Sequence, residues 1–302
     1  AEDIRRGLAA HGLVEAVTYS FMNETQAAGF GGVVDSVRLI NPISADLNVM
    51  RPSILPNLLA AVARNQARGI EDPALFELGP QYADDTPEGQ TLVAAGVRAG
   101  AAAPRHWTER SEPVDAFHAK ADVMAALAIA GAPVDNLTTD RDVPGWYHPG
   151  RAGALRLGKS ILAWFGEINP RIATTFDIDG PLVGFEIFLD AIPPLRTKGP
   201  AKKLLQLSPL QPVHRDFAFI VDETVAAADL VRAVKSGGGA LLTDVSLFDV
   251  YRGKGVEGGR KSLAIAITLQ PVEATLTDDE IEAIAAGIRA SVAKRTGGIL
   301  RG

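Results

Sequence analysis

The chain of 302 residues contains no cysteine. Disulfide bonds, thiolate zinc sites and cysteine nucleophiles are therefore excluded, and the absence is consistent with a reducing compartment. The sequence also lacks a run of about eighteen apolar residues and a charged-apolar-small leader, so we expect neither a membrane span nor a signal peptide. These absences predict a cytoplasmic protein that does not contact a membrane.

Motifs of hydrolases and metalloproteins are missing as well. The five histidines form no H-E-x-x-H motif and no pair four residues apart, so the sequence gives little support to a zinc site. No G-x-S-x-G occurs, which argues against a serine hydrolase. Residues 253–258 match G-x-G-x-x-G, but a strand is predicted after them where a dinucleotide site needs a helix. We interpret this segment as a hairpin tip.

The formal net charge of -6 argues against nucleic-acid binding, because phosphate neutralisation favours basic surfaces. The acidic residues are unevenly distributed, however. From Ser208 onward there are 11 Lys or Arg and 12 Asp or Glu, a net charge of -1, so the preceding part carries -5. Four basic residues gather on one predicted hairpin of the C-terminal part: Arg252, Lys254, Arg260 and Lys261. This separation permits a local basic patch.

The last hundred residues show a βαββαβ order of hydrophobic runs. The first helix ends at three successive glycines, 237–239, and the second begins at Thr277 with acidic residues in its first turn. Such a split βαβ unit forms an open four-stranded sheet that can read single-stranded RNA. The pattern predicts strands at 217–221, 241–251, 262–269 and 298–301, and helices at 225–235 and from 277 to the glycines at 297 and 298.

One face of this predicted sheet is apolar and the other is small and polar. In the third strand Leu263, Ile265, Ile267 and Leu269 alternate with small or hydroxylated residues. The second helix has an apolar stripe that must cover the apolar face, because one hairpin with one helix could not bury that area. We therefore expect the opposite face to be open. The stripe consists of Ile281, Ile284, Ala285, Ile288 and Val292.

Four ordered motifs in this part carry a resemblance to a known family. They resemble the ferredoxin-fold anticodon-binding domain that ends the bacterial phenylalanyl-tRNA synthetase beta subunit. Four upstream segments are similar to the catalytic-like module of the same subunit, so the resemblance covers essentially the whole chain. The C-terminal motifs are Arg215-Asp216, 248–255 (FDVYRGKG), 261–264 (KSLA) and 275–280 (TLTDDE), and the upstream segments are 17–21 (VTYSF), 41–44 (NPIS), 50–56 (MRPSILP) and 75–79 (LFELG).

The pattern of hydrophobic residues before the proline- and glycine-rich stretch around residue 200 indicates an α+β module. We predict residues 1–195 as a class II synthetase-like antiparallel sheet module, 196–207 as a linker, and 208–302 as the ferredoxin-like domain. Within the module we expect strands at 15–22, 33–40, 76–82, 91–98, 153–157, 161–167 and 182–188, and helices at 1–13, 56–66 and 119–130.

The resemblance implies that the module is catalytically silent. Active class II enzymes hold ATP phosphates with arginines, one of which closes a glycine-rich strand-to-helix signature. The matching run here, 182–190 (LVGFEIFLD), contains no arginine, and Phe76 stands where an active strand has an arginine before its acidic residue. For Arg51 and Arg64 we therefore expect salt bridges at a subunit or domain interface.

As a beta-subunit fragment, the chain would have no catalytic, cofactor or metal site of its own. The resemblance implies a catalytic alpha subunit as partner in an (αβ)2 tetramer, tRNA(Phe) as ligand, and ATP and Mg²⁺ as requirements of the holoenzyme only. Alternatives are a freestanding RNA-binding or assembly protein with no synthetase partner, and an adenylate-forming enzyme with unconventional ATP contacts.

Candidate RNA contacts concentrate near the predicted hairpin. Aromatic rings and guanidinium planes stack on unpaired bases, which favours Tyr251 and Arg252. Strand alternation places these two on opposite faces and Phe248 in the core. Arg215 and Asp216 could contact RNA or form an ion pair that braces the first strand. The remaining candidates are Lys254, which could reach a phosphate, Lys261 and Ser262.

Overall fold

The computed structural model describes residues 1–108, 110–194 and 207–301 of the chain. The chain divides into two compact units, Ala1–Gly199 and Pro200–Gly302. The predicted linker, 196–207, lies outside the described residues except for Leu207. In the described part of the chain, no helix combines the length and the apolarity that a membrane crossing requires.

The first unit is built on a seven-stranded sheet in the order β1-β4-β5-β9-β8-β7-β6. Strand β1 runs parallel to β4, and every other neighbouring pair is antiparallel. The predicted antiparallel sheet and the α+β class are therefore confirmed. The strands are β1 (Val14–Glu15), β4 (Ala74–Tyr82), β5 (Gln90–Ala99), β6 (Thr138–Asp140), β7 (Tyr147–Leu157), β8 (Ser160–Ile168) and β9 (Leu182–Phe188).

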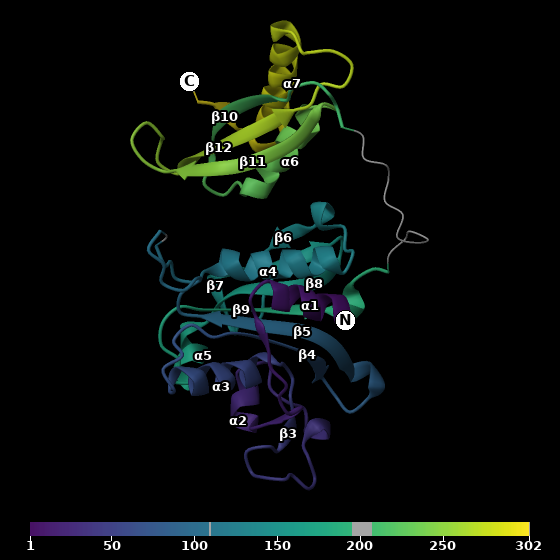
Figure 1. Ribbon diagram of the computed structural model, residues 1–302, viewed down its shortest axis with the longest axis vertical. Coiled ribbons are helices and arrows are strands. Elements are labelled where there is room, and N and C mark those ends of the chain that lie inside the picture. The colour runs from purple at the N-terminus through teal and green to yellow at the C-terminus, as the bar shows by residue number, and fades with distance from the viewer. Residues whose placement is uncertain (109, 195–206, 302) are drawn as a thin grey trace. The chain divides into compact units, whose positions relative to one another are not determined.

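Helices cover both faces of this sheet (Figure 1). On one face α1 (Glu2–Ala10) and α4 (Ala116–Ile129) pack through an apolar cluster that includes Leu8, Leu127 and Phe185. On the other face α3 (Leu55–Gln66) and α5 (Pro170–Thr175) pack through a second cluster that includes Leu58, Val97 and Ala173. The sheet is thus the middle layer of three, and polar groups on its strands must find partners inside the protein.

The segment between α1 and α3 differs from the prediction. The expected strand at 15–22 is broken into β1 and β2 (Phe21–Met22), and β2 pairs with β3 (Val49–Met50) in a separate two-stranded sheet. The expected strand at 33–40 is wrong, because Asp35–Val37 forms one 3-10 turn. Gly31 and Gly32 adopt positive φ of 96° and 74°, which bends the chain before that apolar run can extend.

Two short helices were not predicted from the hydrophobic pattern. Helix α2 (Glu24–Ala28) begins at Asn23 and α5 begins at Asn169, and each asparagine side chain accepts a hydrogen bond from the backbone N–H two residues later. Both helices depend on this capping bond more than on an apolar stripe. A periodicity search over eleven or more residues does not detect elements of five or six residues.

The second unit has the predicted βαββαβ order. Its sheet runs β11-β12-β10-β13 with antiparallel neighbours, the arrangement of a ferredoxin-like fold. The elements are β10 (Val213–Asp222), α6 (Ala227–Gly237), β11 (Leu242–Tyr251), β12 (Arg260–Leu269), α7 (Asp278–Thr296) and β13 (Ile299–Leu300).

Helix α7 confirms the predicted start, stop and stripe. Thr277 and Glu280 form a reciprocal capping box at its N-terminus, and Gly297 ends it in the left-handed conformation with φ of 65°. The stripe packs against the alternating apolar residues of β12, which are all buried, together with Phe219 of β10. The helices therefore occupy the apolar face of the sheet, as expected.

Phe248 corrects the prediction that it lies in the core. Its side chain is 58% exposed. The register of β11 against β12 shifts between Leu247 and Asp249, so Phe248 is the extra residue of a β-bulge. The bulge removes Phe248 from the alternation on which the prediction rested, and Tyr251 then pairs with Ser262.

Two glycines allow α6 and α7 to approach each other closely. A Cβ atom on Gly237, the last residue of α6, would lie 2.7 Å from the carbonyl oxygen of Gly287 and 2.8 Å from Cα of Ile288. Both are backbone atoms and cannot rotate away. The contact between the helices therefore requires glycine at this crossing.

We expect Gly237→Ala to lower the free energy of unfolding of the second unit by about 1–3 kcal/mol, the usual cost of overpacking. Amide hydrogen exchange of β10 and β12 measures this loss. All three tryptophans, Trp107, Trp146 and Trp164, lie in the first unit, so their fluorescence should not change. Gly258→Ala is the matched control, because its Cβ would meet no atom within 4 Å. Equal protection in both variants would contradict the proposed glycine contact.

Candidate functional site

The open face of the second sheet is the candidate nucleic-acid interface. Ala264 and Ala266 of β12 are partly exposed, whereas the alternating apolar residues between them are buried under the helices. The register places Ala218 of β10 opposite Ala264 and Asp216 opposite Ala266. Small side chains in the middle of this face leave the sheet accessible to a flat ligand such as an unpaired base.

Tyr251 ends β11 on this open face, at the edge near the hairpin. It pairs with Ser262, which in turn pairs with Ile220. The Tyr251 hydroxyl donates a 3.2 Å hydrogen bond to the carbonyl oxygen of Lys254. A Cβ on Gly253 would lie 2.7 Å from that hydroxyl, so the glycine permits the ring to lie against the hairpin backbone.

Arg252 is exposed and is paired with a carboxylate. Its Nη2 lies 2.7 Å from Oε1 of Glu223, and its Nε lies 3.1 and 3.2 Å from the two carboxylate oxygens. The hydrogen bond to Glu223 raises the pKa of Arg252, and the hydrogen bond from Arg252 lowers the pKa of Glu223. Exposed ion pairs contribute little net stability, so this guanidinium can exchange its partner for a phosphate.

Two predicted contacts lie beneath the surface. Lys261 is 9% exposed, and its ammonium donates a 2.8 Å hydrogen bond to the carbonyl oxygen of Glu223. Ser262 is 3% exposed. Ser262 lies in the open-face row with Tyr251 and Ile220. The contact of both residues with RNA stays a prediction that requires them to become exposed.

Arg215 and Asp216 point to opposite sides of β10. Arg215 alternates with Phe217 toward the helix-covered side and donates a 3.1 Å hydrogen bond to the carbonyl oxygen of His214. Asp216 is exposed on the open face. Among the salt bridges between described residues there is none that joins Arg215 to Asp216, so the alternative of a bracing ion pair is not supported.

In the first unit, the most unusual group is the buried carboxylate of Glu186 on β9. It is 1% exposed and accepts four hydrogen bonds. The donors are Oγ of Ser53 at 2.7 Å, Nε2 of Gln81 at 3.0 Å, Nε1 of Trp146 at 3.1 Å and the hydroxyl of Tyr147 at 3.3 Å. Burial raises the pKa of Glu186, although these hydrogen bonds oppose the shift.

Arg51 corrects the prediction of an interface salt bridge. It does pair with a carboxylate, Oε1 of Glu77 at 2.8 Å, but the guanidinium is 1% exposed inside the first unit. It also donates to the carbonyl oxygen of Pro80 at 2.9 Å and to Oγ1 of Thr18 at 3.0 Å. This arginine holds β4 to the preceding segment. Arg64 is exposed, and no ion pair of Arg64 occurs among the described residues.

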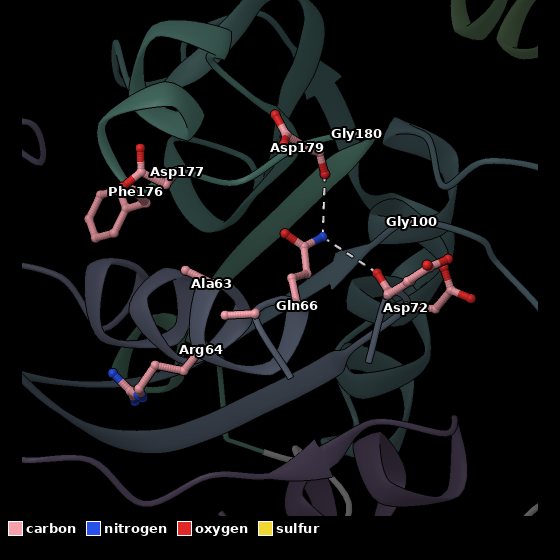
Figure 2. Close-up of a pocket in the computed structure, with 11 residues that line it drawn as sticks. Ala63, Arg64, Gln66, Asp72, Gly100, Phe176, Asp177, Asp179 and Gly180 are labelled. Atoms are coloured by element: carbon pink, nitrogen blue, oxygen red, sulfur yellow. Dashed lines mark hydrogen bonds between the residues drawn. The ribbon is translucent and has the colours of Figure 1, made fainter. Parts of the chain in front are cut away.

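A surface pocket of 780 Å³ lies beside the end of α3 (Figure 2). The amide of Gln66 crosses it and donates to the carbonyl oxygens of Glu71 and Asp179. Its charged lining consists of one cation, Arg64, and four acidic residues: Glu71, Asp72, Asp177 and Asp179. The carboxylates would repel a nucleotide's phosphates. Among the described residues, no cluster of three or more His, Cys, Asp or Glu could hold a metal ion.

Two family models match this chain in succession. The phenylalanyl tRNA synthetase beta chain CLM domain matches residues 1–189, and the ferredoxin-fold anticodon binding domain matches residues 208–301. The first model alone spans more than half of the 302 residues. The chain belongs to the phenylalanyl-tRNA synthetase beta chain family.

Several relatives in this family are similar over nearly the whole chain. Phenylalanine–tRNA ligase beta subunits of Paramagnetospirillum magneticum and Rhodospirillum rubrum are 53% and 52% identical over 99% of this chain, which covers 38% and 37% of their lengths. The chain therefore spans less than half of the relatives it matches. A pyrrolysyl tRNA synthetase of Desulfitobacterium hafniense is 17% identical, with a TM-score of 0.47 over 63% of this chain and 64% of that one.

The charged groups in the interior of this beta chain's first unit have partners within the unit. On β9, Glu186 accepts hydrogen bonds from four neutral donors. On β4, Glu77 is occupied by Arg51 and by the hydroxyl of Thr18 at 2.6 Å. These polar groups satisfy one another and leave none directed at a ligand.

Sequence reasoning missed one residue at the open face of the beta chain's second sheet. Arg301 follows β13, where alternation from Ile299 places it on the open side. The short strand of two residues gave no periodic signal of its own. Counting from Ile299, whose partner is Ile220, would have identified the face on which Arg301 lies.

We expect Glu186→Ala to destabilise the first unit by several kcal/mol, because it leaves three buried donors, Ser53, Gln81 and Tyr147, unpaired at about 1–3 kcal/mol each. Glu186→Gln should cost far less, since the amide keeps one acceptor and Ser53 can accept from its nitrogen. Urea unfolding followed by tryptophan fluorescence measures both. A small loss in the alanine variant would show that the donors find other partners.

The pH dependence of stability, compared between Glu186→Gln and the unaltered chain, gives a second test. A raised folded-state pKa means that the folded protein holds the Glu186 proton more tightly than the unfolded chain. The corresponding stability is present below the unfolded pKa and is lost as the pH rises through the folded one. The unfolding free energy of Glu186→Gln should therefore rise relative to that of the unaltered chain as the pH is raised above the ordinary pKa of a glutamate. A constant difference would contradict the raised pKa.

Proposed function

We propose that this chain is the C-terminal part of the beta subunit of a cytoplasmic phenylalanine–tRNA ligase. In this proposal it scaffolds the catalytic alpha subunit and binds tRNA(Phe) near the anticodon. The observation that carries it is the identity of 49–53% with beta subunits over 99% of the chain. The proposal assigns to this chain the function that the names of those relatives state.

Binding of RNA by the second unit is supported by its accessible sheet face and by the exposed groups beside it. Tyr251, Arg252 and Lys254 lie at the surface near the hairpin, where they can stack on bases or pair with phosphates. Arg215 and Asp216 are exposed at the other end of β10. Lys261 and Ser262, which are buried at the start of β12, complete the proposed set.

Activation of phenylalanine with ATP and Mg²⁺, and its transfer to tRNA, are assigned to the alpha subunit of an (αβ)2 tetramer. The first unit supports this division, because its sheet is covered on both faces and the carboxylates of Glu186 on β9 and Glu77 on β4 are hydrogen-bonded internally. The acidic lining of the 780 Å³ pocket also disfavours a triphosphate.

A surface for the alpha subunit lies on the segment between α1 and α3. Val17 is 90% exposed, and Tyr19 is 68% exposed. Further along, Ile40 and Ile43 are 96% and 83% exposed. Val17 and Tyr19 also line a groove of 610 Å³. Exposed large apolar side chains along one segment indicate a protein interface, and we propose that the alpha subunit covers this segment.

We expect Val17→Asp to weaken assembly with the matching alpha subunit by at least tenfold, because it places a charge in an apolar interface (about 1.4 kcal/mol or more). Sedimentation of the mixed subunits with tRNA(Phe) measures this. Val272→Asp is the matched control, since Val272 is 68% exposed in the second unit. ATP–pyrophosphate exchange should be absent from the isolated chain and present in the complex.

Three outcomes separate the hypotheses. Complex formation that Val17→Asp weakens and Val272→Asp does not would support the scaffold. If the unaltered chain binds tRNA but no alpha subunit, it is a freestanding RNA-binding protein. Robust exchange by the pure chain would instead identify an adenylate-forming enzyme.

We expect Arg252→Ala to weaken tRNA(Phe) binding and to lower the slope of log affinity against log salt by about one, because one phosphate contact is lost. The second unit should remain folded, since the pair with Glu223 is exposed. Arg232→Ala provides the control, because Arg232 on α6 has a similar exposed pair with Asp229. Unchanged affinity at low salt would remove Arg252 from the binding site.

A further inference from the structure

The first unit has a further pocket, of 330 Å³, between the first turn of α4 and the strands β6, β7 and β8. Helix α4 contributes Phe117 and Lys120 to its wall, and the strands contribute Ala152 and Phe165. Phe165 belongs to the apolar cluster beneath α1 and α4. The pocket therefore lies on the face of the sheet that α4 covers, and the proposed function makes no use of it.

Most of the wall of this pocket is apolar. Phe165 is 5% exposed and forms a buried part of the wall, whereas Phe117 is 75% exposed and forms part of the rim. Ala116 and Ala152 carry only methyl groups and leave the space between the rings open. The volume is near the lower end of the range for small-molecule pockets, about 300–1,000 Å³. A small ligand with a flat apolar body fits this wall.

The ammonium of Lys120 is half-buried in the pocket. Its Nζ lies 5.9 Å from the centroid of the Phe165 ring, at the distance of a cation–π contact. Among the salt bridges of the described residues there is none for Lys120, and burial lowers its pKa. The pocket thus holds a positive charge that has lost part of its hydration and that no carboxylate of the described residues compensates.

The carboxylates in the same wall have other partners. Asp115 is the N-cap of α4 and accepts hydrogen bonds from two backbone N–H groups of its first turn. Glu167 on β8 pairs with Arg151 on β7 at 2.5 Å. Both carboxylates would repel a second negative charge on a ligand. The charged groups therefore favour a ligand with a single negative charge, placed at Lys120.

The apolar stem of a buried lysine does not by itself explain this arrangement. Lysines usually bury the stem and keep the ammonium in water. Here the ammonium itself is partly desolvated, and the Phe165 ring compensates only part of that cost, because the pKa of Lys120 is still lowered. An anion that enters the pocket meets a cation in surroundings of low dielectric constant, where their attraction is stronger than in water.

We infer that this pocket binds a small monocarboxylate with a flat apolar body. Nζ of Lys120 donates hydrogen bonds to the carboxylate, and the apolar body lies against the rings of Phe117 and Phe165. The inference goes beyond the proposed function and does not depend on it, because the pocket is complete within the first unit.

Binding of 3-phenylpropanoate to the isolated full chain tests this inference. Saturation-transfer NMR should show saturable binding with a Kd of roughly 1 mM, as expected for a ligand of this size. The neutral isostere 3-phenylpropanamide should bind about tenfold more weakly, because it lacks the charge that Lys120 recognises. The alpha subunit is left out, so that a substrate site on it cannot contribute.

Chemical protection locates the bound probe. Reductive methylation followed by mass spectrometry measures the reactivity of each lysine. At ten times its Kd, 3-phenylpropanoate should slow the methylation of Lys120 by roughly tenfold. Lys159 is the control, because it is exposed at the turn between β7 and β8 and does not line the pocket.

Two variants separate the charge of the pocket from its apolar wall. Lys120→Met keeps an apolar side chain and removes the charge, so it should bind 3-phenylpropanoate about tenfold more weakly and the amide unchanged. Phe117→Ala should weaken the carboxylate and the amide by the same factor, and the exposure of Phe117 means that the fold does not depend on its ring. Lys159→Met is the matched control and should change neither affinity.

Three results would overturn the inference. The first is equal binding of the carboxylate and the amide, which would show that no charge is recognised. The second is equal methylation of Lys120 with and without the probe, or unchanged binding by Lys120→Met, which would place the probe elsewhere. The third is the absence of saturable binding at about ten times the expected Kd. None of them affects the proposed function, since neither RNA nor the alpha subunit is present.

Discussion

The constraint on which both units depend is whether helices cover one face of a sheet or two. In the first unit both faces are covered, so every polar group on a central strand must be satisfied inside the protein. In the second unit the helices cover only the apolar face of the sheet, and the middle of the other face carries small residues. The first arrangement suits a scaffold, and the second leaves a surface on which a base can lie.

The buried polar groups of the first unit bind one another. Glu186 is surrounded by neutral donors, and the Arg51–Glu77 pair is shielded by Thr18. Removing one partner of such a group is costly, because the remaining partner stays buried and unpaired. The cluster therefore fixes the positions of β4 and β9 relative to the segment that leads into α3.

In the second unit, the open face of the sheet carries groups that attract phosphates and groups that repel them. Tyr251 and the guanidinium of Arg301 lie at the hairpin end, whereas carboxylates occupy the positions nearer the other end. An almost neutral unit can bind RNA in this way, because the local field near the ligand matters more than the net charge. In the proposed complex, the acidic positions would orient the RNA by excluding phosphates.

The sequence by itself determined the order of elements, the apolar stripe of α7 with its capping box, and the alternation that assigns the faces of β12, because caps and periodicity are properties of neighbouring residues. Only the tertiary structure decided three further features. A bulge exposes Phe248, Glu186 receives hydrogen bonds from residues 133 and 105 positions away, and Arg301 reaches Tyr251 across the two central strands, β10 and β12. These depend on strand register and sheet order, which local patterns do not encode.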